Sequence, residues 1–187
     1  MEATARRQLV CASSTDGLRR LITTARRTMP MLHKSLSVLA ILALSTLFGA
    51  SIYDTVVFGP NLQAGGPEGL EHGRHFMVAA TPAKLFRVLS PATQAFLLLC
   101  VIFFWRTPRL RWLFLGSLVA ILACDAITFS YAYPRLRVLF ASPLTTSAAD
   151  LSRAANEWVA CNYIRVALVL ASWFACLAAI RNTAVAP

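Results

Sequence analysis

The chain has 187 residues, of which 57% are hydrophobic and only 14% charged, and its formal net charge is +10. This composition is too apolar for an ordinary soluble protein, and the length leaves room for about one domain. The basic excess does not indicate nucleic-acid binding, because seven of the 18 Lys and Arg residues precede residue 35 instead of forming a binding face. We therefore predict an integral membrane protein.

The N-terminal segment differs in composition from the rest of the chain. Residues 1–34 are rich in Arg, Ser and Thr and poor in acidic residues, which predicts a basic, disordered cytoplasmic tail. Met29 and Met31 are alternative starts. From Met31, His33 and Lys34 would precede the first apolar run like the charged region of a signal anchor.

Four apolar segments are candidate membrane-spanning helices. The first, residues 36–58, holds 23 residues, which is enough for a tilted helix across a hydrocarbon core of about 30 Å. The others cover residues 91–105, 112–133 and 159–180, and the second is so short that its helix would need the preceding turns. The pattern predicts an all-α, integral membrane four-helix bundle over residues 35–181.

Prolines and potential capping residues set the predicted ends of the spans. Gly59 and Pro60 are expected to end the first span and Pro134 the third, because proline lacks an N–H and its ring clashes with the preceding turn. Ser90 is the predicted N-cap of the second span, with Pro91 in its first turn. These residues define where the predicted spans begin or end.

The connecting segments are predicted to be mostly irregular. Residues 61–73 are Gly-rich and predict a loop, whereas residues 75–89 mix apolar and basic residues in a way typical of an interfacial helix. Residues 134–156 predict a polar loop in which Asp150 caps the start of the fourth helix. Residues 182–187 form a short C-terminal tail.

The distribution of Lys and Arg predicts the orientation, because cytoplasmic flanking segments carry the basic excess. With both termini inside, 11 of the 18 basic residues are cytoplasmic: seven in the tail, then Arg106, Arg109, Arg111 and Arg181. We expect an N-in, C-in topology in the cytoplasmic membrane.

Three charged residues fall within or at the ends of the predicted spans, where an Asp or Arg costs about 2.5–3.5 kcal/mol at mid-helix. Asp54, Asp125 and Arg165 all lie toward the outer side in this topology. One guanidinium can satisfy two carboxylates. The trio therefore forms either a buried ion network that fixes helix register or a reactive, ligand-binding site, unless the side chains snorkel to the surface.

The fourth span begins with a polar and aromatic stripe. Trp158, Asn162 and Arg165 are spaced four and three residues apart, so they share one helix face. A cavity lined by an indole, an amide and a guanidinium could hold a flat phenolic or quinone-like molecule, with Arg165 stabilising an enolate or phenolate. The alternative is a Trp anchor at the membrane interface beside a structural salt bridge.

Histidines and tyrosines supply further candidates. His72 and His75, with Glu71, predict a general base or proton relay, a metal site or merely solvated loop histidines. Tyr53 is typical of the aromatic belt at a membrane interface. The five cysteines are scattered without a CxxC pair, so no thiol chemistry or zinc site is assigned.

Several short motifs resemble the anthrone oxygenase-like family of small four-helix membrane proteins. They are Gly49-x3-Tyr53 followed by Pro60, Pro134 with the basic segment Arg135 to Arg137, and Trp158-x3-Asn162-x2-Arg165. The resemblance covers about residues 36–181 and leaves the tail unmatched.

The resemblance implies the family fold and, for the enzymatic members, oxidation of an anthrone to an anthraquinone by dioxygen without a metal or flavin cofactor. By analogy Arg165, Asn162 and Trp158 would line the substrate pocket, with Asp125 and Tyr53 as further candidate substrate-binding residues. Asp54 or His75 would be the base, although neither belongs to a matched motif.

Two classes of function therefore remain open. The first is a cofactor-independent oxygenase, or a protein that binds a small aromatic molecule, with a pocket in the outer leaflet. The second is a non-catalytic membrane subunit or lipid-binding bundle whose intramembrane charges are structural and whose basic tail contacts anionic lipid or a partner. Membrane lipids are expected partners in both, and an oligomer is compatible with either.

Overall fold

The computed structural model describes residues 31–64, 66–79, 81–141 and 146–185. Across these ranges the chain is helical and contains no strand. Four continuous helical rods are long and apolar enough to cross a membrane: Met31–Ala64, Pro82–Phe103, Pro108–Phe140 and Ala148–Asn182. The predicted all-α four-helix membrane bundle is confirmed. The predicted tail lies outside the described residues up to residue 30, whereas residues 31–34 already belong to the first rod.

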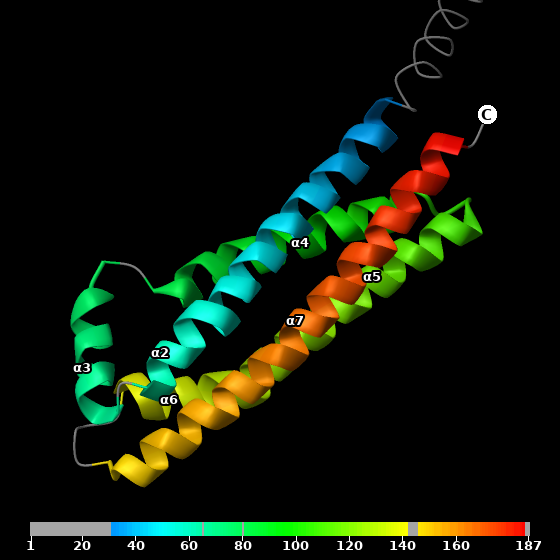
Figure 1. Ribbon diagram of the computed structural model, residues 1–187. Helices are drawn as coiled ribbons and strands as arrows, with labels where there is room; N and C mark the ends of the chain where they lie inside the picture. Colours follow the sequence, from blue (N-terminus) through cyan, green and yellow to red (C-terminus); the bar gives the residue numbers. More distant parts are fainter. Residues whose placement is uncertain (1–30, 65, 80, 142–145, 186–187) are drawn as a thin grey trace, which may run out of the picture.

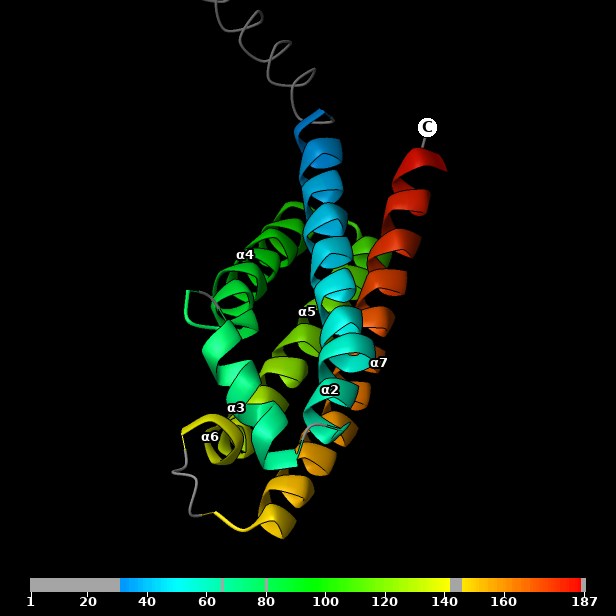
Figure 2. The same cartoon turned by 60° about the vertical axis from the view of Figure 1, so that its left-hand side comes forward.

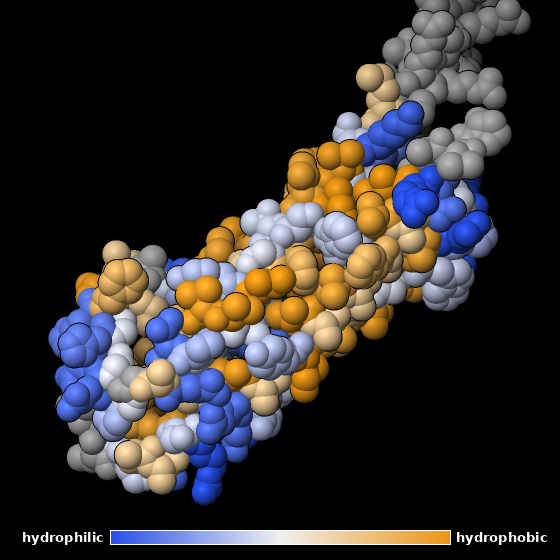
Figure 3. All heavy atoms as spheres, in the orientation of Figure 1, coloured by the Kyte–Doolittle hydropathy of each residue, from blue (hydrophilic) through white to orange (hydrophobic). Residues whose placement is uncertain are grey.

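The rods run alternately up and down (Figures 1 and 2). The start of the first rod, the end of α7 (Ala148–Val185) and the connection from α4 (Pro82–Phe103) to α5 (Pro108–Ile127) lie at one end. The short helices α3 (Gly66–Phe76) and α6 (Tyr133–Ala141) lie at the other end. Apolar residues cover much of the middle of the molecule in Figure 3, with hydrophilic residues toward both ends. This distribution matches a hydrocarbon layer between two polar interfaces.

Two of the rods contain a π-helical segment, and each segment ends two residues before a proline. In η1 (Asp54–Phe58) the N–H of Gly59 bonds to the carbonyl five residues earlier, and in η2 (Thr128–Ala132) the N–H of Tyr133 does the same. The wider turn lets the chain remain helical through the following proline. The first rod therefore continues as α2 (Gly59–Ala64) and the third as α6. The predicted stops at Pro60 and Pro134 are wrong.

The second rod begins earlier than predicted. Thr81 is the N-cap of α4 and Pro82 opens its first turn, whereas Ser90 and Pro91 lie inside the helix. Membrane helices tolerate an internal proline because neighbouring groups satisfy the freed carbonyl. The separate interfacial helix predicted over residues 75–89 is also wrong, since a turn after α3 divides that segment and most of it belongs to α4.

The other connections contain more helix than predicted. The expected loop over residues 61–73 is taken up mainly by α2 and α3, and the expected loop over residues 134–156 by α6 and the start of α7. Ser147, not Asp150, caps α7: its Oγ accepts a hydrogen bond from the Asp150 N–H at 3.1 Å and donates one to Asp150 Oδ2 at 2.6 Å. Asp150 is thus the partner of the cap, and α7 extends to Val185 through most of the expected C-terminal tail.

The buried side chains form two apolar clusters separated by a polar layer. The larger cluster, which includes Leu44, Phe114 and Val169, lies toward the connection between α4 and α5, and the smaller, which includes Leu62 and Leu139, lies toward α3 and α6. The layer between them is buried but polar, and its members are Ser51, Asp54, Thr55, Thr128, Asn162 and Arg165. Because buried polar groups are costly in a bilayer unless partnered, this layer is the natural place to look for function.

Candidate functional site

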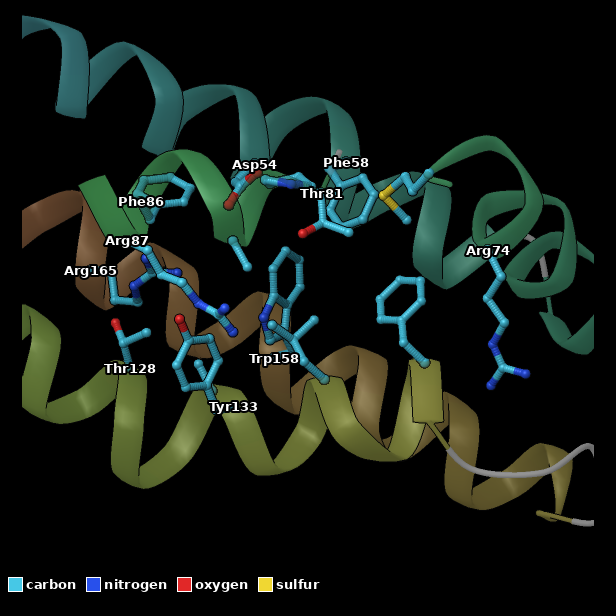
Figure 4. Close-up of a pocket in the computed structure, with 16 residues that line it drawn as sticks. Asp54, Phe58, Arg74, Thr81, Phe86, Arg87, Thr128, Tyr133, Trp158 and Arg165 are labelled. Atoms are coloured by element: carbon cyan, nitrogen blue, oxygen red, sulfur yellow. The ribbon is translucent and has the colours of Figure 1, made fainter. Parts of the chain in front are cut away.

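A cavity of about 400 Å³ opens beside the polar layer. Figure 4 shows its labelled lining residues projecting from the first rod, from α3, from α4 and its N-cap, from the third rod and from α7. Its charged and hydroxyl lining residues are Asp54, Arg74, Thr81, Arg87, Thr128, Tyr133 and Arg165. Its other aromatic lining residues are Phe58, Phe86, Phe140 and Trp158. The cavity therefore combines an aromatic interior with several charged groups, as small-molecule sites commonly do.

The π-helical segments place side chains on two facing walls. Asp54 and Phe58 are the first and last residues of η1, and Thr128 and Ala132 are the first and last residues of η2. A π turn rotates the side chains that follow it relative to an α-helix, and such turns occur frequently at functional sites. The local irregularity thus shapes the cavity as well as carrying both rods past their prolines.

Arg165 is the most constrained cation of the cavity. Its side chain is only 7% exposed, its Nη1 donates to Asn162 Oδ1 at 2.5 Å, and its guanidinium lies 5.4 Å from the ring centre of Phe86. Its Nε is buried without a hydrogen-bond partner in the described structure. Asp54 lines the same cavity and is 5% exposed. Its carboxyl group interacts electrostatically with the Arg165 guanidinium. The cavity thus contains a carboxyl group and a guanidinium group.

The predicted ion network is not found. Within the described residues the two ion pairs are Arg135 with Glu157 and His75 with Glu71, and Arg165 pairs with neither intramembrane carboxylate. Asp125 instead accepts hydrogen bonds at Oδ2 from Ser90 Oγ at 2.7 Å and Gln94 Nε2 at 2.6 Å. Hydroxyl and amide donors from α4 therefore satisfy the Asp125 carboxylate, which explains why it does not require Arg165.

A second cavity of about 270 Å³ adjoins the first. Phe86, Arg87, Thr128, Tyr133 and Arg165 line both, and Asp125 lines only the second. The three helices carrying the charged trio therefore converge as predicted, but the two carboxylates occupy different chambers on either side of Arg165.

The aromatic wall is anchored on α7. Trp158 is 2% exposed and meets Phe58 edge to face, with ring centres 5.7 Å apart, and Phe58 stacks on Phe140 at 6.3 Å. The indole Nε1 is buried with no partner among the described residues. As predicted, Trp158, Asn162 and Arg165 all face inward. A buried indole N–H normally finds a partner, so this unpaired donor beside the cavity is unusual.

The remaining candidates lie outside the main cavity. Tyr53 is 57% exposed and lines a separate surface groove together with His72. His75 is exposed, with its Nε2 4.0 Å from Glu71 Oε1, and it lines neither the main cavity, the adjoining chamber nor this groove. In the described part of the chain no three His, Cys, Asp or Glu side chains gather in a way that could hold a metal ion.

Sequence reasoning missed several cavity residues. Arg74 donates from Nη2 to the carbonyl oxygen of Leu139 at 2.6 Å, and Arg87 and Tyr133 line the cavity from α4 and α6. The sequence does show basic residues just before the predicted second span, and these could have indicated further cavity residues. Arg87 falls within a membrane helix only because α4 begins at Pro82, nine residues before the predicted start. Tyr133 was obscured by the expectation that Pro134 ends the third helix.

Comparisons of the chain with protein-family models, curated proteins and solved structures find no match. The functional interpretation therefore rests on the chemistry of this cavity.

Proposed function

We propose that the protein is a membrane enzyme that binds a flat aromatic ketone or phenol in this cavity and oxidises it with dioxygen, as the resemblance to anthrone oxygenases implies. The supporting observation is the juxtaposition, around one aromatic cavity, of the Asp54 carboxylate with the unpartnered donors of Arg165 and Trp158. A volume of about 400 Å³ also falls within the range of about 300–1,000 Å³ usual for small-molecule sites.

Asp54 is the proposed general base. Its carboxylate would take one proton from a CH₂ group flanked by two aromatic rings, and the ketone that joins the same two rings on the opposite side would accept the charge as an enolate. Arg165 would stabilise the enolate oxygen through charge-assisted hydrogen bonds, while Trp158 would hold the ring system and offer its N–H. Asp54 is preferred to His75 because it lines the cavity whereas the imidazole is exposed elsewhere.

The oxidation then balances with dioxygen as the only co-reactant. The carbanion carbon adds dioxygen to form a peroxide, to which Asp54 returns the proton it removed. Loss of water, using the second hydrogen of the original CH₂, leaves a ketone. One oxygen atom enters the product and the other leaves as water, so no further reductant is consumed.

We place the cavity in the outer leaflet of the cytoplasmic membrane, following the N-in, C-in topology that the basic residues predict. A substrate dissolved in the lipid could then enter laterally. The alternative of a non-catalytic bundle with purely structural charges is less well supported, because a structural role predicts direct ion pairs for Arg165 and the described residues provide none.

The test is oxygen uptake and product mass with anthrone, using purified full-length protein in nanodiscs. We expect Asp54→Asn to lower kcat by about 100-fold or more, a loss typical of removing a general base, and Arg165→Lys to lower it less. Glu71→Gln and His75→Asn, which alter exposed groups outside the cavity, are matched controls and should retain wild-type turnover. Absence of turnover, or full activity of a folded Asp54→Asn protein, would refute the proposal.

A further inference from the structure

The charges around the main cavity are unequal. Three guanidinium groups, those of Arg74, Arg87 and Arg165, line it together with one carboxylate, that of Asp54. Arg165 is partnered by Asn162 and Arg74 by the carbonyl of Leu139. The lining of the main cavity is therefore net positive and favours a ligand that brings negative charge.

Arg87 is the cation for which the protein supplies no partner. It lies in the second turn of α4, and none of the described residues forms a hydrogen bond or ion pair with its guanidinium. Asp125 lines the adjoining chamber with Arg87, but its Oδ2 already accepts hydrogen bonds from Ser90 and Gln94. The Arg87 side chain is exposed and lies near the start of α4, so its charge is not satisfied within the bundle and can meet a bound anion.

The position of Arg87 defines where an anionic group would sit. It lines both chambers, as do Arg165 and Tyr133, and Figure 4 shows these three residues toward one end of the cavity with Arg74 at the other. Aromatic residues also line the cavity, and the Phe58 ring contacts those of Phe140 and Trp158. A rigid molecule with an apolar ring body and one acidic end matches this arrangement.

We infer that the substrate is an aromatic acid whose carboxylate binds Arg87 while its ring system lies against Trp158, a specificity that rests on the proposed function. Arg165, which also lines the cavity, is left for the ketone or enolate oxygen. The planar guanidinium of Arg87 binds a carboxylate through two parallel hydrogen bonds, which a lysine ammonium cannot reproduce. Arg87 is thus a specificity-determining residue and Asp54 the base.

The experiment measures binding rather than turnover, so it can succeed or fail independently of the oxygenase chemistry. Purified protein in zwitterionic nanodiscs is titrated with two product-like probes, anthraquinone-2-carboxylate and the neutral 2-(hydroxymethyl)anthraquinone, following quenching of tryptophan fluorescence. Nanodiscs without protein correct for partition of each probe into lipid. The variants are Arg87→Gln, Arg87→Lys and the control Arg137→Gln, whose exposed side chain lines neither cavity.

We expect wild type and Arg137→Gln to bind the carboxylate probe about tenfold or more tightly than the neutral probe, as one charge-assisted pair would provide. Arg87→Gln should abolish this preference without weakening the neutral probe, and Arg87→Lys should restore only part of it. Equal affinities of wild type for both probes, or a preference that survives Arg87→Gln, would overturn the inference.

A lipid phosphate offers Arg87 the same anionic chemistry, so the titrations are repeated with phosphatidylglycerol in the nanodiscs. If the aromatic acid is the ligand, the carboxylate preference persists with only a modest fall in affinity. If phosphatidylglycerol removes the preference in wild type, Arg87 is a headgroup anchor and the inference is wrong. Oxygen uptake by Asp54→Asn reports separately on the proposed catalysis, so failure of one proposal does not imply failure of the other.

Discussion

The first rod packs closely against α7 at Gly59, and replacing this glycine by alanine should destabilise the bundle. A Cβ at residue 59 would lie 3.0 Å from Val159 Cγ2, 3.4 Å from the backbone oxygen of Asp54 and 3.8 Å from Trp158 Cζ3. Carbon atoms pack best at about 3.5–4.0 Å, so the contact with Val159 is too short by about 0.5 Å. Val159 is buried and β-branched, and its side chain cannot rotate away freely.

The magnitude follows from two opposing effects. Overpacking of a buried site costs about 1–3 kcal/mol, whereas alanine is a better helix former than glycine by up to about 1 kcal/mol. Gly49 lies in the same rod, but a Cβ added there meets nothing within 4 Å, so Gly49→Ala carries only the second effect. The free energy of unfolding of Gly59→Ala should therefore be about 1–3 kcal/mol below that of Gly49→Ala.

Reversible unfolding in mixed micelles, with SDS as the denaturant and helicity followed by circular dichroism, measures this difference. Gly59→Ala should push the first rod away from α7. Because these two helices carry Asp54 and Trp158, which line the cavity, the substitution should also weaken the binding of aromatic probes. Gly59→Ala that is as stable as Gly49→Ala would refute the packing argument.

Three further outcomes follow from the structure. Arg165→Ala should lower the midpoint of thermal unfolding in detergent more than Asp125→Asn does. The first substitution leaves the buried Asn162 without its hydrogen-bond donor, whereas an amide at residue 125 can still accept a hydrogen bond from Ser90. Equal losses of thermal stability would contradict this. Ser172→Ala should lower the free energy of unfolding by about 0.6 kcal/mol. The Ser172 hydroxyl donates to the Ser117 carbonyl at 3.0 Å, and the Ser117 hydroxyl donates to the Ser172 carbonyl at 2.9 Å. An unchanged unfolding curve would exclude a stabilising role for this pair. In a Cys11→Ser background, His72→Cys should react with a membrane-impermeant maleimide in intact cells, whereas protection until lysis would reverse the N-in topology.

The existence of four membrane-spanning helices could be predicted from sequence because it depends on local composition. A run of apolar residues long enough to cross the hydrocarbon core must satisfy its backbone within the segment, and a helix does this without help from its neighbours. The inward stripe of Trp158, Asn162 and Arg165 was equally accessible, since helical periodicity places residues four and three apart on one face. Their burial agrees with that reasoning.

The helix ends were less predictable because proline acts through context. Pro60 and Pro134 usually terminate a helix, but here a π turn precedes each of them and the rods continue. The expected stop at Pro134 hid Tyr133, and the expected start of the second span at Pro91 hid the fact that Arg87 belongs to a spanning helix. No local pattern in the sequence distinguishes a proline that ends a helix from one that follows a π turn.

The partners of the charged residues depended on the tertiary structure. The sequence by itself determined that Asp54, Asp125 and Arg165 belong to apolar segments and that burying them requires compensation. It could not determine that Ser90 and Gln94 compensate Asp125 while Arg165 faces Asp54 across a cavity, because these pairings join residues on different helices. Hydropathy is a property of each segment, whereas the rotation and offset of one helix against another arise only when all four pack together.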